Sequence, residues 1–401
     1  MGIRGRRGNG WLRTVAVSAG AILAVAVAVA VAGCGTAVGR GVDPGRSPVA
    51  AKAAGASAEA AQSGGPVASA GPGWTLAEYS AARVSEGQPG RAGATTLYLV
   101  SPQGTKTTLY RWGAAGEPSW RLVDWSGDKA RALFVGSTPN SVGQLVLANG
   151  KFTSFELPGG TQAISYSRPD GTAILAVQQA SGGDKILRYD LTGKLEKTLA
   201  TGPRDAANVA LYSADGASLA VNGAQGLEQV SNSGGPAKSL PVPGAGTCQP
   251  VRWWNTSTIL ASCLASGGTA SRLWLVPVTG GKPTALTAQR DGKGPDLGDV
   301  DAWKLPSGLY LQALGPCGVI FIAKQASDGS ATAVNVPQTK GNDNQVVTAD
   351  GGRLLVRAQT SCVSSTSLLW FTPATNAVQM LIQAPSGTQG VIAAVAYRKD
   401  T

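Results

Sequence analysis

The hydrophobic pattern is most regular between Ala163 and Gly202, where four short apolar stretches alternate with polar turns. Residues 169–171 (PDG), 181–184 (SGGD) and 192–193 (TG) are turn signals, and the stretches between them have strand length. Such short alternating or continuous apolar runs predict β-strands. Four antiparallel strands cannot bury both of their faces alone, so we expect this unit to have a neighbour on each side.

The same pattern recurs along the chain from Trp74 onward. Turns between the first and second strands are predicted at residues 126–129, 168–171, 213–216, 255–258, 305–308 and 348–351. Third strands with their turns are predicted at residues 97–104, 144–150, 186–193, 227–235, 273–281, 319–329 and 368–376. The third strands follow one another at roughly 42–48 residues, which is the spacing of propeller blades.

The two ends of the repeat region complement each other. The first unit has a second strand near Trp74–Arg83 but no first strand before it, and residues 390–400 form a first-strand pattern with no followers. Pairing these segments completes the missing unit. The sequence therefore predicts an all-β fold over residues 73–401, a seven-bladed β-propeller of four-stranded antiparallel blades closed by the C-terminal strand.

Several of these repeats carry a family signature. The PDG turn at 169–171 and the ADG turns at 214–216 and 349–351 precede AILAV, SLAV and RLLV, and LWLVPVTGG occupies 273–281. These segments resemble the WD40/YVTN-type repeats of TolB-like bacterial propellers. The resemblance covers residues 74–401 and implies the propeller fold. No α/β domain pattern precedes the repeats, so the resemblance does not imply a TolB-type translocation role.

The N-terminus has the layout of a secretory signal peptide over residues 1–33. A basic start reaching Arg13 is followed by an apolar run over residues 15–32. A run of about 18 residues is also long enough for an uncleaved membrane-spanning helix, which is the alternative. VAGC at 31–34 resembles the lipobox of bacterial lipoproteins. This resemblance implies that Cys34 carries a lipid such as palmitate and becomes the first residue of the mature protein.

Residues 34–72 are mostly Gly, Ala, Ser and Pro and contain few large apolar side chains. Such a segment cannot bury enough surface to fold, so we expect a flexible tether with an r.m.s. span of roughly 35 Å. The expected location of the protein is therefore extracytoplasmic, lipid-anchored at the outer face of the cytoplasmic membrane. The Ala- and Gly-rich composition is typical of a high-GC bacterium.

The chain contains no histidine. This excludes Ser-His and Cys-His catalysis and the commonest ligand for zinc, copper and haem iron. We expect no catalytic residue, no metal and no cofactor.

Without the signal segment, the chain has 30 basic and 23 acidic side chains, a net charge of +7 that favours anionic partners. The basic residues are scattered and accompany no nucleic-acid motif, so nucleic acid is not an expected partner.

Four cysteines follow the anchor: Cys248, Cys263, Cys317 and Cys362. In an exported chain they point to two disulfides, for which three connectivities exist. In the repeat register, Cys248 precedes the first strand and Cys263 ends the second strand of one unit, while Cys317 and Cys362 end second strands in the next two units. We therefore predict the bonds Cys248–Cys263 and Cys317–Cys362. A four-thiolate metal site is the alternative, and it requires reduced cysteines and closer spacing.

The rim that carries these cysteines also carries the longest connection, residues 288–300. Asp296, Asp299 and Asp301 are spaced loosely like a calcium loop, although the full pattern is absent and a solvated charged loop is the alternative. The candidates for a ligand or partner site facing the central funnel are Trp120, Asn208, Arg252, Trp253, Asp301, Trp303 and Gln345. Alternatively, the tryptophans fill gaps between blades.

Three functions fit these observations. The first is a non-catalytic binding or scaffold module for a protein or cell-envelope component. The second is a propeller-hosted hydrolase or lyase acting on polysaccharide, for which Asp205 and Asp301 would be the paired carboxylates. The third is an accessory lipoprotein of a sensor kinase or transporter. The absence of histidine, of a nucleophile elbow and of a phosphate loop favours the first.

Overall fold

The computed structural model describes residues 65–84, 93–113, 119–202, 210–266, 268, 270–290, 297–340, 343–360 and 365–397. These residues form an all-β structure with one short helix, α1 (Gly65–Ala68), and one 3-10 turn, η1 (Pro316–Gly318). Within the described ranges, neither helical segment has the length and apolar character needed to cross a membrane. The predicted signal segment and Cys34 lie outside these ranges.

Three of the sheets contain four antiparallel strands each, in chain order. The first consists of β4 (Trp120–Trp125), β5 (Arg131–Gly136), β6 (Ser141–Val146) and β7 (Lys151–Glu156). The second consists of β8 (Thr161–Tyr166), β9 (Ala173–Gln178), β10 (Lys185–Asp190) and β11 (Leu195–Thr201). The third consists of β12 (Ala210–Tyr212), β13 (Ser218–Gly223), β14 (Gly226–Ser231) and β15 (Lys238–Ser239). The strands predicted from the 163–202 pattern are thus β8 to β11.

Two further sheets contain eight strands each, and each consists of two four-stranded groups. One sheet contains β16 (Ala245–Asn255), β17 (Thr258–Ala265), β18 (Ser271–Pro277) and β19 (Thr284–Ala285), followed by β20 (Gly298–Leu305), β21 (Gly308–Leu314), β22 (Ile320–Gln325) and β23 (Ala331–Ala333). A single parallel residue pair, Ser271 with Gly298, joins its two groups.

The other eight-stranded sheet joins the two ends of the described chain. It contains β24 (Asn344–Asp350), β25 (Arg353–Gln359), β26 (Thr366–Thr372) and β27 (Ala377–Ile382), together with β28 (Thr388–Ala396), β1 (Thr75–Arg83), β2 (Thr95–Val100) and β3 (Lys106–Trp112). A single parallel pair, Thr366 with Gly390, connects the two groups. Strand β28 runs antiparallel to β1 from Thr75↔Ala396 to Arg83↔Thr388, so the C-terminal strand pairs with the N-terminal unit as predicted.

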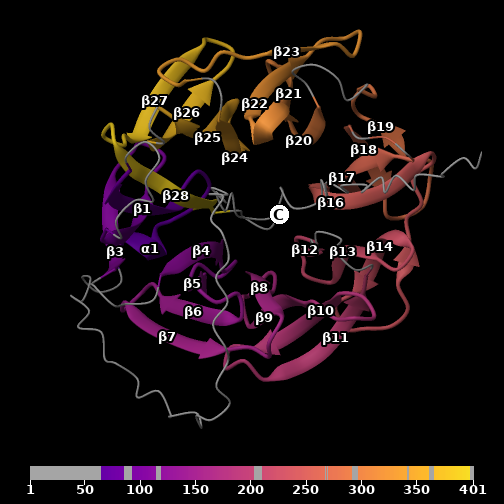
Figure 1. The fold of residues 1–401 in the computed structure, drawn as a ribbon, viewed down its shortest axis with the longest axis horizontal. Helices are drawn as coiled ribbons and strands as arrows, with labels where there is room; N and C mark the ends of the chain where they lie inside the picture. The colour runs from indigo at the N-terminus through magenta and orange to yellow at the C-terminus, as the bar shows by residue number, and fades with distance from the viewer. Residues whose placement is uncertain are drawn as a thin grey trace, which may run out of the picture.

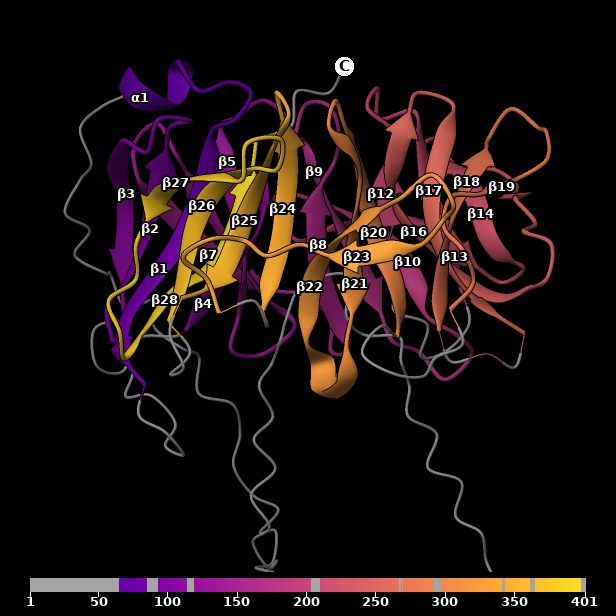
Figure 2. The ribbon, with the colours of Figure 1, turned by 90° about the horizontal axis from the view of Figure 1, so that it is seen from above.

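The four-stranded groups are arranged around a common centre in Figure 1, with β4, β8, β12, β16, β20, β24 and β28 nearest to it. The same strands run between the two rims in Figure 2. Neighbouring groups contact each other directly, because β28 contacts β4, β4 contacts β8, β12 contacts β16 and β24 contacts β28. The first strands of the groups therefore form the inner wall.

The apolar core lies between neighbouring groups rather than within one of them. Leu97 of β2 and Phe134 of β5 belong to one cluster of buried side chains, and Ile322 of β22 and Leu369 of β26 belong to another. All four side chains are fully buried. Each sheet thus covers the apolar faces of its neighbours, which is why the four-strand pattern recurs along the chain.

The turn glycines are required where the turns of neighbouring groups meet. Gly216, in the ADG turn between β12 and β13, has a φ of 69°, which L-residues rarely adopt. A Cβ at this position would overlap the carbonyl oxygen of Arg168, which begins the equivalent PDG turn of the preceding group. The repeated aspartate–glycine turns are therefore needed for packing as well as for chain reversal.

The tether boundary is the main correction to the predicted organisation. The predicted flexible segment includes residues 65–72, yet Gly65–Ala68 forms α1, and Val67 and Ala70 are buried. These two side chains pack in the same cluster as Trp125 of β4, and the Lys129 ammonium donates a hydrogen bond of 2.5 Å to the Ala70 carbonyl. Val67 and Ala70 are enough to fix this part of the Gly/Ala/Pro-rich stretch, because the four-stranded groups provide an apolar surface against which they pack.

Candidate functional site

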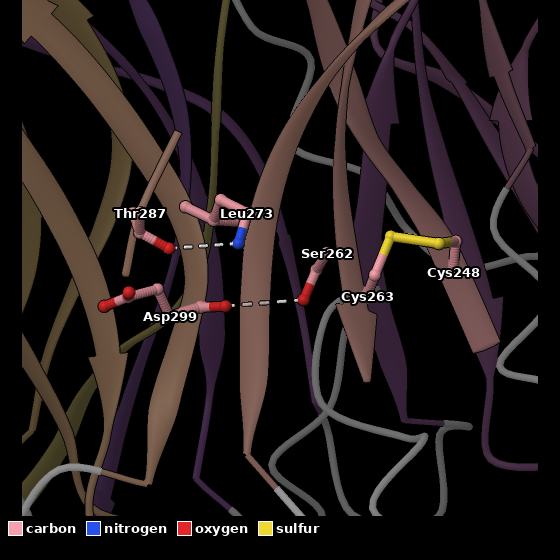
Figure 3. Close-up of a disulfide and its surroundings, with 6 residues drawn as sticks. All are labelled: Cys248, Ser262, Cys263, Leu273, Thr287 and Asp299. Carbon is pink, nitrogen blue, oxygen red and sulfur yellow. Dashed lines mark hydrogen bonds between the residues drawn. A yellow bond between two sulfur atoms is a disulfide. The ribbon is translucent and has the colours of Figure 1, made fainter. Parts of the chain in front are cut away.

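The rim where first strands begin is cross-linked by a disulfide. Cys248 of β16 and Cys263 of β17 are direct partners in the antiparallel register, and a disulfide joins them, as Figure 3 shows. This is the pairing expected from the repeat. Cys362 and the side chain of Cys317 lie outside the described residues, so the second predicted bond stays a prediction.

Next to the disulfide, β20 is attached to the preceding group through Asp299. The Ser271 hydroxyl donates a hydrogen bond of 2.9 Å to the Asp299 carbonyl, and Ser262 donates one of 3.4 Å to the same oxygen; the Ser262 contact is drawn in Figure 3. The Asp299 side chain is fully buried, and its carboxylate lies 3.7 Å from Arg290. This contact positions the start of β20.

Asp299 and Asp301 do not converge on a common cation. Asp299 pairs with Arg290, whereas Asp301 pairs with Arg252, and a register shift separates the two aspartates in the ladder of β20 and β21. Asp296 lies outside the described residues. In the described part of the chain, no three His, Cys, Asp or Glu side chains are grouped so as to hold a metal ion. The two described aspartates of the loop thus serve as ion-pair partners.

The inner wall carries a charged and aromatic cluster across two neighbouring groups. Nη2 of Arg252, on β16, lies 2.7 Å from Oδ1 of Asp301, on β20. The Arg252 guanidinium also lies over the Trp303 ring, 4.5 Å from its centre, and 5.9 Å from the Trp254 ring. Asp301 and Trp303 are two residues apart on one strand and therefore point to the same face. Arg252 bridges the two groups by an ion pair and a cation–π contact.

A small hollow continues from this cluster toward the next group. It has a volume of about 30 Å³. It is lined by Val300, Asp301, Trp303, Gln312, Ile320, Gln345 and Val346. A space of this size holds about one or two water molecules, or the end of one small ligand group. The hollow thus combines an aliphatic side with one carboxylate, one indole and two amides. We refer to Arg252, Asp301, Trp303 and Gln345 as the inner-wall site.

Gln312, on β21, fixes the far side of this hollow. Its Oε1 accepts a hydrogen bond of 2.7 Å from the Val346 N–H, and its Nε2 donates bonds of 2.9 Å to the carbonyls of Asn344 and Phe321. Because all three partners are backbone groups, the amide holds β24 at a defined distance from β21. Gln312 was not predicted from sequence, although a polar residue inside the apolar run GLYLQAL is a visible signal.

Arg357 and Asp343 are a second pair of charged residues beside Gln345; Arg357 is half-buried and Asp343 is exposed. Arg357 is the antiparallel partner of Gln345, and its guanidinium donates to the Ile392 carbonyl of β28. Burial lowers the pKa of Arg357, and the Asp343 charge opposes that shift. Burial also raises the pKa of Asp343, opposed by Arg357. Arg357 thus joins β25 to β28 of the following group.

The structure brings together four of the seven predicted site residues, namely Arg252, Asp301, Trp303 and Gln345. Trp120 instead packs edge-on against Phe152, with ring centroids 5.1 Å apart. The Trp253 indole N–H donates a hydrogen bond of 3.2 Å to the Leu211 carbonyl, and its ring packs against a core cluster. These two tryptophans thus fill gaps between strands, the alternative noted above. Asn208 lies outside the described residues, as does Asp205.

Comparisons with known proteins support the fold. No family model matches the chain. No curated protein matches it either. Among solved structures, a prolyl endopeptidase has a TM-score of 0.52 at 12% identity, covering 78% of this chain and 50% of its own. A puromycin hydrolase has a TM-score of 0.50 at 14% identity, covering 78% of this chain and 52% of its own.

TolB proteins are also among the structural neighbours. TolB from Acinetobacter baumannii has a TM-score of 0.43 at 14% identity, covering 80% of this chain and 66% of its own. The chain therefore spans between about half and two thirds of the length of these three structures. At such identities the similarity concerns the fold alone. The protein is an all-β protein of four-stranded antiparallel sheets with TolB-like structural neighbours.

Proposed function

We propose that the protein is a closed seven-bladed β-propeller, held at the outer face of the cytoplasmic membrane by a lipid on Cys34, that binds a protein or a cell-envelope polymer without transforming it. The pairing of β28 with β1 supports closure, because it supplies the first strand that the N-terminal group lacks. The Cys248–Cys263 disulfide supports an oxidising compartment outside the cytoplasm.

The observation that carries the binding role is the inner-wall site. Arg252 is held between Asp301 and Trp303, and the hollow beside them is open to one small group of a ligand. Desolvated arginine and tryptophan side chains are the residue types that dominate binding energy at protein interfaces. A hollow of about 30 Å³ takes in only the end of one side chain or one small sugar substituent, so the remaining contacts with an extended partner must be made along the rim.

The same geometry favours binding over hydrolysis of a polysaccharide. Glycoside hydrolysis uses two carboxyl groups on opposite sides of the scissile bond. Among the residues that line the hollow, Asp301 is the carboxylate, and Arg252 pairs with it. Incubating the purified protein with cell-wall glycans tests the enzymatic alternative. We expect no new reducing ends or unsaturated products, and their appearance in the wild type but not in Asp301→Asn would establish that alternative.

Site-directed photo-crosslinking in intact membranes tests the binding role. A crosslinker at Gln345, in the hollow, should yield a discrete adduct that is lost in Arg252→Met, whereas one at Glu156, exposed on β7, should not yield it. The same adducts from both positions would contradict the proposed site. Anchoring is tested separately with Cys34→Ser, which should move the protein from the membrane to the soluble fraction and abolish labelling by a fatty acid.

A further inference from the structure

A second polar feature, apart from the inner-wall site, recurs where one four-stranded group meets the next. We call these contacts between neighbouring groups the seams. Glu78, on β1, is fully buried, and its Oε2 accepts a hydrogen bond of 2.7 Å from the Leu122 N–H of β4. Gln312, on β21, does the same with the Val346 N–H of β24, also at 2.7 Å. In both cases a side chain on a second strand reaches the backbone of the next group's first strand.

The two positions are equivalent in register. Glu78 is paired with Leu97, the third residue of β2, and Gln312 with Ile322, the third residue of β22. Their backbone donors, Leu122 and Val346, are likewise the third residues of β4 and β24. The side chains differ by one group, because glutamine has an NH₂ where the acid has Oε1. The two seams are therefore equivalent in strand register and in their hydrogen bond to the next group.

At the Gln312 seam, the NH₂ group donates to the carbonyls of Asn344 and Phe321. The carbonyls in equivalent positions near Glu78 belong to Trp120 and Thr96, the first residue of β4 and the second residue of β2. An ionised carboxylate can only accept hydrogen bonds and thus has nothing to offer a carbonyl. Within the described residues, Oε1 of Glu78 is buried and has no hydrogen-bond partner. A proton on this oxygen would make it a donor, as the Gln312 amide is.

The charges around Glu78 are few. Strands β2 and β28, which flank β1, carry no charged side chain. Arg121 on β4 is the neighbour whose charge acts on Glu78. Burial of the Arg121 guanidinium lowers the pKa of that group. The other charged side chains on β1 and on the adjacent β3, β4 and β5 are exposed or paired elsewhere: Arg83, Lys106, Arg111, Asp124 and Arg131.

We propose that Glu78 is a buried proton-binding site: a carboxylic acid that keeps its proton at neutral pH, donates it to a backbone carbonyl, and completes the seam between β1 and β4. Burial supports this protonation state by raising the pKa of Glu78 to about 8, against the opposing effects of the Leu122 N–H and Arg121. In the unfolded chain the same carboxyl group has its ordinary pKa of about 4.5.

The direction of the pH effect follows from these two values. Between about pH 4.5 and pH 8 the folded protein holds a proton that the unfolded chain has released, so stability falls as the pH rises through this window. Above about pH 8, Glu78 is ionised in both the folded and the unfolded protein, and the stability that its proton contributed is fully lost. Alkaline pH therefore weakens the contact between the group that contains β28 and β1 and the following group, which begins with β4.

Urea unfolding of the full chain at pH 5, 7 and 9 tests the proposal with Glu78→Gln, which copies the Gln312 seam. We expect Glu78→Gln to match the wild type at pH 5 and to be more stable at pH 9. At pH 9 the unfolding equilibrium constant of the wild type should exceed that of Glu78→Gln on the order of a thousandfold. Glu156→Gln, which changes an exposed glutamate on β7, should leave the pH profile unchanged. An equal destabilisation by Glu78→Gln at every pH would show that Glu78 is ionised and would overturn the proposal.

A second pair of measurements keeps the proposal testable if Glu78→Gln does not fold. Gln312→Glu should introduce the same alkaline sensitivity at the seam between β21 and β24. Infrared spectroscopy of the wild type should show a buried protonated carboxyl group at pH 7 that ionises near pH 8. The absence of such a group at pH 7 would overturn the proposal without the use of any variant.

Discussion

Arg252 and Asp301 form an ion pair of 2.7 Å between β16 and β20, the first strands of two neighbouring groups. Both side chains are about four-fifths buried, and the guanidinium also lies over the Trp303 ring. Removing either partner leaves a charge that water reaches poorly. The pair therefore joins two neighbouring groups at the place where a ligand is expected to bind.

We expect Arg252→Met and Asp301→Asn each to lower the free energy of unfolding by about 1–3 kcal/mol, since a partly buried charge loses its partner. The double variant should lose clearly less free energy of unfolding than the two single variants together, and a double-mutant cycle by urea unfolding measures the difference. The longer and more accessible pair Arg353–Asp350, at 3.8 Å, is the control and should show almost no coupling. Additive effects of Arg252 and Asp301 would contradict the described contact.

The Asp124 carboxylate should matter more for stability than any exposed ion pair. It accepts a hydrogen bond of 2.7 Å from the Tyr166 N–H and is held by Arg168 at 2.8 and 3.1 Å. Asp124→Ala removes all of these bonds and leaves Arg168 without a buried counter-charge, so we expect a loss of about 3–5 kcal/mol. Thermal or urea unfolding measures it.

The matched control for Asp124 is Glu196→Ala. Glu196 pairs with Arg188 at 2.8 Å but is 40% exposed. Solvent screening should limit the effect of this substitution to less than about 1 kcal/mol. Equal costs for the two substitutions would show that the Asp124 bonds do not hold β4 and β8 together.

The disulfide between Cys248 and Cys263 should stabilise the rim by restricting the unfolded chain. It closes a loop of 15 residues, for which chain entropy gives about 3 kcal/mol. We expect the double Cys→Ala variant to lose about this much under oxidising conditions. An unchanged free energy of unfolding would show that the bond does not form in the purified protein.

Peptide mapping of the non-reduced protein tests the other predicted bond. We expect a cross-linked peptide that contains Cys317 and Cys362 in addition to the one that contains Cys248 and Cys263. The predicted 45-residue loop would contribute about 4 kcal/mol, so Cys317→Ala with Cys362→Ala should be the more destabilising pair. Two free thiols in the full chain after the anchor would contradict this prediction.

Deleting residues 388–401 removes β28 and leaves β1 with only one of its two antiparallel partners, β2. The deletion exposes the buried side chains of Leu76 and Ala77 and an unpaired strand edge, so we expect aggregation or loss of cooperative unfolding. Size-exclusion chromatography and thermal unfolding measure this outcome. Deleting only residues 398–401 retains β28 and should have little effect. Similar unfolding midpoints for both deletions would show that β28 is dispensable.

The strand pattern was predictable because turn chemistry and apolar spacing are local properties of the sequence. Each predicted third strand corresponds to an observed one, from β2 to β26. The fourth strands were less predictable: β15 and β19 contain two residues each. A strand at the outer edge has one neighbour and little buried surface, so the sequence there is under weaker constraint.

The candidate site was predicted only in part, for reasons of strand geometry. Arg252 and Trp253 are consecutive in β16, and successive side chains of a strand point to opposite faces. Both therefore could not face the same neighbouring group: Arg252 pairs with Asp301 of β20, whereas Trp253 donates to the Leu211 carbonyl of β12. The roles of Gln312 and Glu78 depend on partners 34 and 44 residues away in the chain, which no local pattern identifies.

The ladder between β1 and β28 has a consequence for how the molecule is produced. These strands lie at opposite ends of the described chain, so one edge of β1 stays unpaired until β28 has been synthesised. Until then every incomplete chain offers a ready template for intermolecular pairing. A growing chain that lacks β28 therefore needs its β1 edge shielded from other chains, and the risk of intermolecular pairing should fall once β28 is present.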